Sequence, residues 1–297
     1  MAKEMGVVNT NLSASIAQAS LMRNERSLNT AMEQLSTGKK INSAADNASG
    51  LAITSRMTSQ IRALDQAVRN ANDARSMIST AEGALDEITS MLQRMRELAV
   101  QAGTGTNSVK DRSYIVQEFR ELTAEIERIS ANTQWNGRNI LDGTAGGSGA
   151  SSNVAFQVGM NPTQVISVTF GNFESMSGVM ASLNGDDIFI ALENLRDFPF
   201  ASAANAAGRI IVSTDAALEA VSTQRATFGA VSNRLTHAID NLTNVKTQAE
   251  GARSRILDTD YAQSTSELAR TQIIKQAGTA MLAQANQLPS TVLALLR

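Results

Sequence analysis

The chain has 297 residues, with 26 Lys or Arg against 28 Asp or Glu, so its formal net charge is −2. This balance argues against nucleic acid as the main partner, because backbone binding needs a clustered basic excess. The absence of cysteine excludes disulfides and thiolate metal sites, and a single histidine argues against zinc clusters and a Ser-His triad. A composition of 42% hydrophobic but only 4% aromatic residues is typical of packed helices, and we expect neither enzyme activity nor a cofactor.

Residues 1–20 are polar and mixed in charge, and they lack the basic and apolar parts of a secretory signal. No stretch approaches the ~20 apolar residues that span a bilayer, so no membrane partner is expected. These features predict a cytosolic protein, or one exported by a route that reads no such signal.

A weak heptad repeat predicts a first helix that carries Leu21, Leu28 and Leu35. A break at residues 36–50 follows, in which Gly38 stands where a helix C-cap glycine would.

A stronger repeat predicts a long helical rod after this break, with two alternating apolar positions. The first position holds Met57, Leu64, Ala71, Ile78, Leu85, Leu92 and Ala99, and the second holds Ala67, Ala74, Ala81, Ile88 and Met95. This spacing is that of a coiled-coil seam, in a rod of roughly 65 Å at ~1.5 Å per residue. A shorter helix is expected to fold back after the breaker at residues 102–107, with one face formed by Ile115, Phe119, Leu122, Ile126 and Ile129.

The middle of the chain has a different pattern. Residues 143–152 are rich in Gly, Ser and Ala and are typical of a flexible loop. Residues 153–158 and 164–170 alternate apolar and polar side chains around a connector that contains Gly, Asn and Pro, which predicts a β-hairpin.

The returning half of the rod has heptads from Ala217 to Ile256, followed by a break at residues 257–263 and a final helix. Asp258, Thr259 or Asp260 could cap this helix, whose weak stripe should pair with that of the first helix. Its members are Ile274, Met281, Leu288 and Leu295. The two breaks lie at matching positions from the two ends, which predicts one helix pair stacked on a larger bundle.

The C-terminus carries Val292, Leu295 and Leu296 close together, where terminal residues are usually polar. Apolar side chains left bare invite association, so we expect these to be buried against other subunits. The carboxylate groups Asp186–Asp187 and Asp258/Asp260 lie in turn contexts, where helix capping explains them better than metal binding.

Several long motifs occur in the order found in bacterial flagellin, and the chain resembles that family. They include LSTGKKINSAADNASGLAI at 35–53, LQRMRELAVQAGTGTNS at 92–108, QWNGRNILDG at 134–143, ARSRILDTDYA at 252–262 and QAGTAMLAQANQ at 276–287. The resemblance implies a mainly α fold, in which a long coiled-coil bundle of N- and C-terminal segments carries a small central region with a β-hairpin.

The resemblance also implies a domain plan. Residues 1–42 and 257–297 would form an inner terminal domain in the filament core. Residues 43–143 and 208–256 would form the helical rod, with a hairpin at 153–170, and residues 144–207 a short variable surface segment.

The implied function is that of a structural subunit of the extracellular flagellar filament, exported by the type III apparatus. Its implied partners are further copies of itself, an export chaperone, the filament cap, hook–filament junction proteins and a host Toll-like receptor. A hook–filament junction protein and a generic secreted coiled-coil protein remain the alternatives.

Three sets of site residues follow. The assembly set is Leu21, Leu28, Leu35, Ile274, Met281, Leu288, Val292, Leu295 and Leu296. The resemblance implies a receptor set of Gln93, Arg94, Glu97, Leu98 and Glu118, in which Arg94 and Leu98 should be accessible because they flank the seam. Candidate glycosylation sites are Ser148, Ser151, Ser152, Ser175, Ser177 and Ser182.

Overall fold

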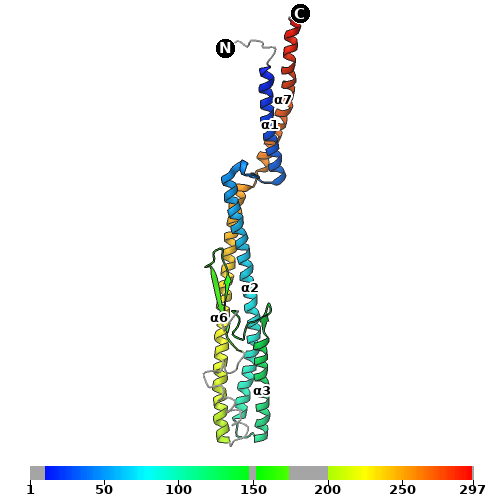
Figure 1. Cartoon of the computed structure of the whole chain (residues 1–297). Coiled ribbons are helices and arrows are strands. Elements are labelled where there is room, and N and C mark those ends of the chain that lie inside the picture. The colour runs from blue at the N-terminus through cyan, green and yellow to red at the C-terminus, as the bar shows by residue number, and fades with distance from the viewer. Residues whose placement is uncertain (1–10, 147–151, 174–199, 296–297) are drawn as a thin grey trace. The chain divides into compact units, whose positions relative to one another are not determined.

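The computed structural model describes residues 11–146, 152–173 and 200–295. Its helices are α1 (Leu12–Thr37), α2 (Ala44–Ala102), α3 (Val109–Asn132), α6 (Phe200–Leu257) and α7 (Tyr261–Leu295). Two short hairpins, β1–β2 (Gln134–Trp135, Arg138–Asn139) and β3–β4 (Asn153–Gln157, Val165–Thr169), lie between α3 and α6 (Figure 1). The predicted mainly α fold with a small hairpin-containing central region is confirmed.

The chain divides into two compact units, which we describe separately. The terminal unit comprises Met1–Ile61 and Thr247–Arg297, and the central unit comprises Arg62–Lys246. These boundaries fall inside α2 and α6, whereas the domain plan from the sequence places them at the breaks near residues 42 and 257.

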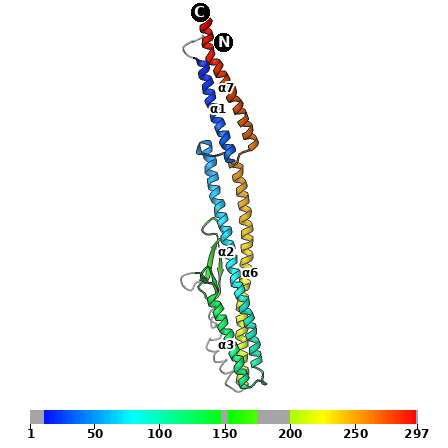
Figure 2. The ribbon, with the colours of Figure 1, turned by 90° about the vertical axis from the view of Figure 1, so that its right-hand side faces the viewer.

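In the terminal unit, α1 and α7 lie side by side and run in opposite directions (Figures 1 and 2). Helix α1 ends at Gly38, whose left-handed φ of 69° suits a residue without a Cβ atom. Asp260 caps α7, since its Oδ1 accepts from the amide of Ala262 at 2.9 Å. Backbone bonds join the two breaks, with the Lys40 N–H donating to the Leu257 carbonyl and the Thr259 N–H to the Gly38 carbonyl. Both predicted caps are therefore present.

The predicted break at 36–50 is shorter than expected, because α2 begins at Ala44. A second interruption lies at Asn47, which leaves the helical conformation and accepts the amide of Gly50 at 2.8 Å through its side chain. Gly50 packs against the buried Ile41, and a Cβ atom at position 50 would lie only 2.6 Å from Ile41 Cδ1. The Asn47 side chain therefore caps the long part of α2, and position 50 needs glycine because of its contact with Ile41.

The core of the central unit follows the predicted seam. All described heptad positions of α2 from Leu64 to Ala99 are at most 2% exposed. From Ala71 onward these positions pack with α3 and α6 in one apolar cluster, to which α3 contributes Ile115, Phe119 and Ile126 and α6 contributes Ala217, Val221, Phe228, Val231 and Leu235. Ion pairs join α2 to α6 at its surface, with Arg96 to Asp215 at 2.6 Å and Lys246 to Asp65 at 2.6 Å.

The predicted hairpin at 153–170 is confirmed. Strands β3 and β4 pair antiparallel, so that Phe156 lies opposite Ile166. The hairpin is tied to both rod helices, since the Asn70 amide donates to the Gln157 carbonyl and the Gln224 amide to the Thr169 carbonyl.

The hairpin β1–β2 was not predicted from the sequence. Its turn places Asn136 and Gly137 at φ 51° and 75°, the two positive values of a type I′ turn. The Asn-Gly dipeptide was the available signal. Helix α6 also includes residues 200–207, which the sequence analysis placed in the surface segment.

Candidate assembly and recognition surfaces

The face of α7 that meets α1 carries small residues spaced seven apart, with the half-buried Leu268 and Leu282 between them. The small residues are Ser264, Thr271, Gly278 and Ala285, all buried except the half-buried Gly278. The partner face of α1 includes the buried Leu28 and the half-buried Leu21 and Leu35. The predicted pairing of the Ile274 and Met281 stripe with α1 is wrong, because both side chains are exposed. Small residues allow the two backbones to approach closely, which the larger side chains would prevent.

Polar contacts cross the same pair of helices. The Asn24 side-chain amide donates to the Thr271 carbonyl at 2.8 Å, and the Asn11 amide donates to the Ala285 carbonyl at 2.7 Å. Lys275 Nζ lies 3.2 Å from Glu25 Oε1 in an exposed ion pair. The α1–α7 pair therefore combines narrow apolar contacts with directional hydrogen bonds.

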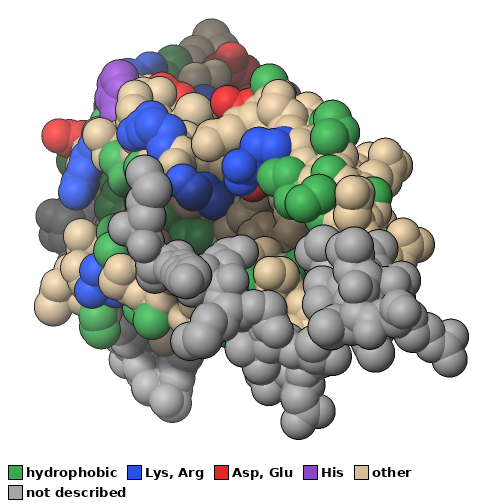
Figure 3. Space-filling model, turned by 90° about the horizontal axis from the view of Figure 1, so that it is seen from above, with side chains coloured by type: hydrophobic (Ala, Val, Ile, Leu, Met, Phe, Trp, Pro, Cys, Tyr) green, Lys and Arg blue, Asp and Glu red, His purple; other side chains and the backbone are tan. Residues whose placement is uncertain are grey.

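The outer faces of the pair carry large apolar side chains in contact with solvent. Ile273 is 66% exposed and Met281 63% exposed on α7. We call the exposed set the apolar terminal surface, and it consists of Leu12, Ile16, Met22, Met32, Ile273, Ile274 and Met281. In a space-filling view along the molecule, hydrophobic side chains are interspersed with basic and other polar ones (Figure 3).

The predicted assembly set divides accordingly. Leu28 is buried within the chain, so its assignment to contacts between subunits is corrected: it belongs to the seam with α7. Ile274 and Met281 are free to meet another molecule. Leu296 lies outside the described residues, as do the side chains of Leu288, Val292 and Leu295. The members of the apolar terminal surface that were missed, because they fall between heptad positions, are Leu12, Ile16, Met22, Met32 and Ile273.

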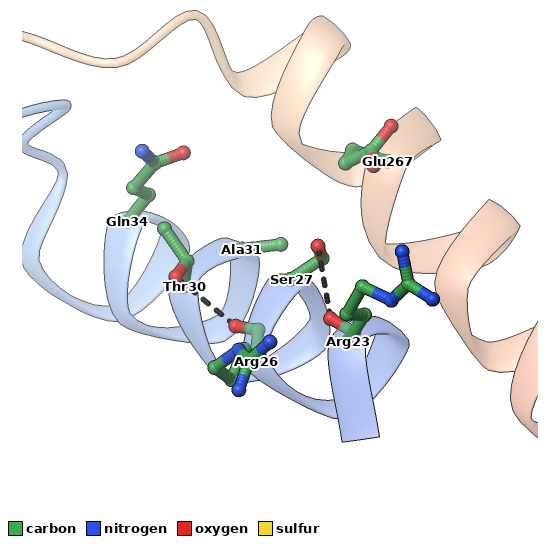
Figure 4. Close-up of a pocket in the computed structure, with 7 residues that line it drawn as sticks. All are labelled: Arg23, Arg26, Ser27, Thr30, Ala31, Gln34 and Glu267. Atoms are coloured by element: carbon green, nitrogen blue, oxygen red, sulfur yellow. Dashed lines mark hydrogen bonds between the residues drawn. The ribbon is translucent and has the colours of Figure 1, made fainter. Parts of the chain in front are cut away.

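A shallow hollow of about 530 Å³ lies between α1 and α7, with a polar lining (Figure 4). It is lined by Arg23, Arg26, Ser27, Thr30, Ala31, Gln34 and Glu267. Arg270 donates to Glu267 at 3.0 Å and so lowers the pKa of that carboxyl. The lining offers polar contacts and no nucleophile with a base beside it.

On the central unit, Arg94 links α2 to α3. Its Nε donates to Glu118 Oε1 at 2.9 Å, and its Nη1 lies 3.2 Å from Glu97. The hydrogen bond to Glu118 is the main cause that raises the pKa of Arg94. Gln93 is also exposed, so four of the five predicted receptor residues lie on the accessible surface of this unit.

The expectation for the fifth residue is wrong, because Leu98 is only 1% exposed. Helix α2 packs against both α3 and α6, so its buried arc is wider than the seam of a two-helix coiled coil. The apolar residue that does reach solvent here is Val100, which is 52% exposed. It lines a groove of about 600 Å³ together with Gln93, Arg96, Glu97, Gln101 and Thr104.

Most of the remaining predicted site residues lie outside the part of the chain that the structure describes. Ser152 is half-buried next to β3, and the other candidate glycosylation serines lie outside the described residues, as do Asp186 and Asp187. Among the residues that the structure describes, no group of three or more His, Asp or Glu side chains could hold a metal ion. Within the same residues, no helix is long and apolar enough to cross a bilayer.

Comparison with known proteins covers nearly the whole chain. The profile of the bacterial flagellin N-terminal helical region matches residues 8–146, and that of the C-terminal helical region matches residues 211–296. The flagellin of Halalkalibacterium halodurans is 44% identical over 98% of this chain and 100% of its own. The flagellin of Bacillus subtilis strain 168 is 43% identical over 98% and 99%.

Among solved structures, one described as a flagellar hook-associated protein from Vibrio parahaemolyticus covers 72% of this chain and 100% of its own. Its TM-score is 0.62 at 15% identity, so this likeness concerns the fold alone.

Proposed function

The chain belongs to the bacterial flagellin family, and on that premise we propose that its apolar terminal surface joins the subunits of the flagellar filament. Members of this family are structural subunits that polymerise into an extracellular filament. This assignment separates the chain from the junction-protein and generic coiled-coil alternatives, because its near full-length relatives are flagellins.

The observation that carries the proposal is the exposure of large apolar side chains around α1 and α7. A single chain buries a narrow seam between these helices, while Ile16, Ile273 and Met281 stay exposed to water. Burying such side chains contributes roughly 1.5–3 kcal/mol each, so a second copy of the chain would stabilise the pair considerably. A head-to-tail interface that does not close on itself gives an open helical polymer.

The domain plan follows from this role. We assign residues 1–42 and 257–297 to the filament core, and residues 43–143 and 208–256 to the surrounding rod with its hairpin at 153–170. Residues 144–207 would face outward. Backbone hydrogen bonds join the two helix breaks, from Lys40 to Leu257 and from Thr259 to Gly38. These breaks support a domain boundary near residues 42 and 257.

The test replaces the exposed apolar side chains by glutamine. Ile273→Gln with Met281→Gln should reduce growth on filament seeds, because both side chains lose their apolar contact with the next subunit. Thr279→Gln is the matched control, since it puts the same residue at an exposed polar position of α7. Normal seeded growth of the double variant, measured by negative-stain microscopy, would contradict the proposal.

For export we propose the flagellar type III route, with an export chaperone, the filament cap and hook–filament junction proteins as partners. The exposed apolar side chains of α1 and α7 support a chaperone, because a free subunit would otherwise aggregate through them. Deletion of the export apparatus should keep the protein in the cell. Its appearance in the medium of such a strain would contradict this route.

For recognition we propose that a host Toll-like receptor contacts Gln93, Arg94, Glu97 and Glu118. The support is an exposed, hydrogen-bonded charge cluster beside a groove that contains one accessible valine, Val100. An arginine beside an apolar residue is a common composition of binding hot spots. Leu98 would act only by holding α2 in place, because it does not reach the surface.

The burial of Leu98 changes the test. Leu98→Ala would open a cavity and disturb folding, so Arg94→Ala should be made alone, with Arg128→Ala as the control on an exposed ion pair of α3. We expect reduced receptor signalling by soluble Arg94→Ala and unchanged signalling by Arg128→Ala, with equal circular dichroism. Undiminished signalling by folded Arg94→Ala would contradict the assignment. O-glycosylation of Ser148, Ser151, Ser152, Ser175, Ser177 and Ser182 is a further proposal, which mass spectrometry of native filaments would test.

A further inference from the structure

Leu21 on α1 packs directly against Gly278 on α7. A Cβ atom at position 278 would lie 2.8 Å from Leu21 Cδ2 and 3.2 Å from Leu21 Cγ. Real Cβ atoms essentially never come within 3.0 Å of another atom, so a Cβ atom at position 278 would force the Leu21 side chain or the helices to shift.

Gly278 is also the only glycine in either helix, since residues 12–37 contain none and residues 261–295 contain no other. Glycine inside a helix costs roughly 0.5–1 kcal/mol relative to alanine. Position 278 therefore carries a local cost that the fit to Leu21 explains.

We infer that the Leu21–Gly278 contact sets the register of the α1–α7 pair, and that filament assembly depends on this register. A slip of one heptad would bring Thr271 or Ala285 to the place of Gly278, and each of these residues carries a Cβ atom. The native register alone puts Leu21 opposite a residue without one.

The asparagine hydrogen bonds in the pair do not make this choice, and the exposed ion pair of Lys275 with Glu25 contributes little to it. The Asn24 amide donates to a backbone carbonyl, that of Thr271, and a helix offers an equivalent carbonyl at every turn. After a slip of one heptad, Asn24 would find another acceptor. Asn24 and Asn11 therefore hold the helices together, while Leu21 and Gly278 decide which residues face each other.

The end of the pair where α1 ends at Gly38 and α7 begins at Tyr261 agrees with this register. The segment from Leu21 to Gly38 is as long as that from Tyr261 to Gly278, about 25 Å at 1.5 Å per residue. At this end, the Thr259 amide donates to the Gly38 carbonyl at 3.1 Å, and a Cβ atom at Gly38 would lie 3.0 Å from the Tyr261 hydroxyl oxygen. If α7 slipped past α1 at the level of Gly278, one helix would therefore have to bend, or the hydrogen bond between Thr259 and Gly38 would have to break.

A fixed register matters because each subunit of a helical polymer must offer the same surface to the next. A slip of one heptad would move Ile273 and Met281 along the pair by about 10 Å, which is longer than a side chain. This inference rests on the proposed role of the apolar terminal surface in assembly.

The test uses the absence of cysteine, which makes two introduced thiols the only ones in the chain. Glu25→Cys with Lys275→Cys replaces the ion pair across α1 and α7, and a short bismaleimide should join these positions in the free chain or in filaments. In that background Gly278→Ala is compared with Gly229→Ala, a helical glycine whose added methyl group meets nothing within 4 Å.

We expect Gly278→Ala to reduce both the cross-link yield and seeded growth about tenfold. Gly229→Ala should change neither. Adding Leu21→Ala to Gly278→Ala removes the clashing carbons and permits the native register again, so the cross-link yield should rise above that of Gly278→Ala, which a general loss of folding would not allow. Circular dichroism of each variant confirms that the helices remain.

Equal yield and growth for Gly278→Ala and Gly229→Ala would overturn the inference, and so would the absence of rescue by Leu21→Ala. Absence of the 25–275 cross-link from both free chain and filaments of the parent would overturn it as well. If the free chain cross-links in this register but growth never depends on Ile273 and Met281, the register stands and the proposed assembly surface fails.

Discussion

The rings of Phe170 and Phe228 meet with their centroids 5.2 Å apart and their planes tilted by 53°. Phe170 follows β4 and Phe228 lies on α6, and both are completely buried. This contact joins the end of the hairpin to the core of the rod. A tilted aromatic pair contributes stability beyond that gained by burying the two rings.

Replacing Phe170 by alanine should therefore destabilise the central unit by about 3–5 kcal/mol, the usual cost of emptying a buried phenylalanine site. Val165→Ala is the control, because Val165 lies on β4, the strand that Phe170 follows, with its side chain exposed. Urea unfolding monitored by circular dichroism would measure both. Similar midpoints for the two variants would show that the hairpin does not stabilise the rod.

Replacement by alanine at Gly50 and at Gly83, both in α2, should change the free energy of unfolding in opposite directions. Gly50→Ala should lower the free energy of unfolding, because its methyl group would collide with Ile41. Gly83→Ala should raise that free energy by about 0.5–1 kcal/mol, since nothing lies within 4 Å and alanine favours the helix. Thermal unfolding of the two variants would compare them directly, and a more stable Gly50→Ala variant would contradict the packing described at Ile41.

Ser130 is completely buried on α3, and its hydroxyl has no hydrogen-bond partner. Ser130→Ala should therefore stabilise the central unit by about 1 kcal/mol, because an unsatisfied buried hydroxyl is removed. Ser213→Ala is matched to it, since Ser213 is equally buried but donates to the Ile210 carbonyl at 2.9 Å. We expect that control to lose stability. Denaturant unfolding in which Ser130→Ala is the less stable of the two would contradict the description of the site.

The capping box at the start of α3 should make the stability of that helix depend on pH. Asp111 accepts from the hydroxyl and the backbone amide of Ser108, and these bonds lower the pKa of its carboxyl below the usual 3.8. Because the folded pKa is the lower one, the stabilisation is complete above the unfolded value and disappears as the pH falls through the folded value.

Asp111→Asn should remove this dependence and leave the other carboxylates unaffected. The difference in unfolding free energy between parent and variant, measured from pH 6 downward, should shrink toward zero in the acid range. A difference that stays constant over this range would show that Asp111 is not hydrogen-bonded in the folded chain.

Removal of Leu288–Arg297 should leave a folded central unit and abolish polymerisation. The reason is the apolar character of Val292, Leu295 and Leu296, which we expect to be buried between subunits. Circular dichroism would follow folding, and seeded growth would follow assembly. Normal filaments from the shortened chain would show that these residues are dispensable.

The sequence alone determined the elements whose pattern is local. The buried positions of α2 were predicted from Leu64 to Ala99, because heptad spacing brings these residues to one side of any long helix. The cap at Gly38 and the β3–β4 hairpin were likewise predicted, and the cap of α7 was narrowed to Asp258, Thr259 or Asp260, since turn and capping chemistry depends on a few neighbouring residues. The family was recognisable for a similar reason, as its motifs are contiguous.

The tertiary structure decided which side chains each helix hides. Leu98 was expected at the surface, yet it is buried because α2 has two neighbours, and no single-helix pattern reports how many neighbours a helix has. Ile274 and Met281 form a regular apolar stripe that faces solvent in the single chain, whereas Gly278 meets α1. That choice depends on how closely two backbones approach, a distance set by side chains nearly the whole chain length apart in the sequence.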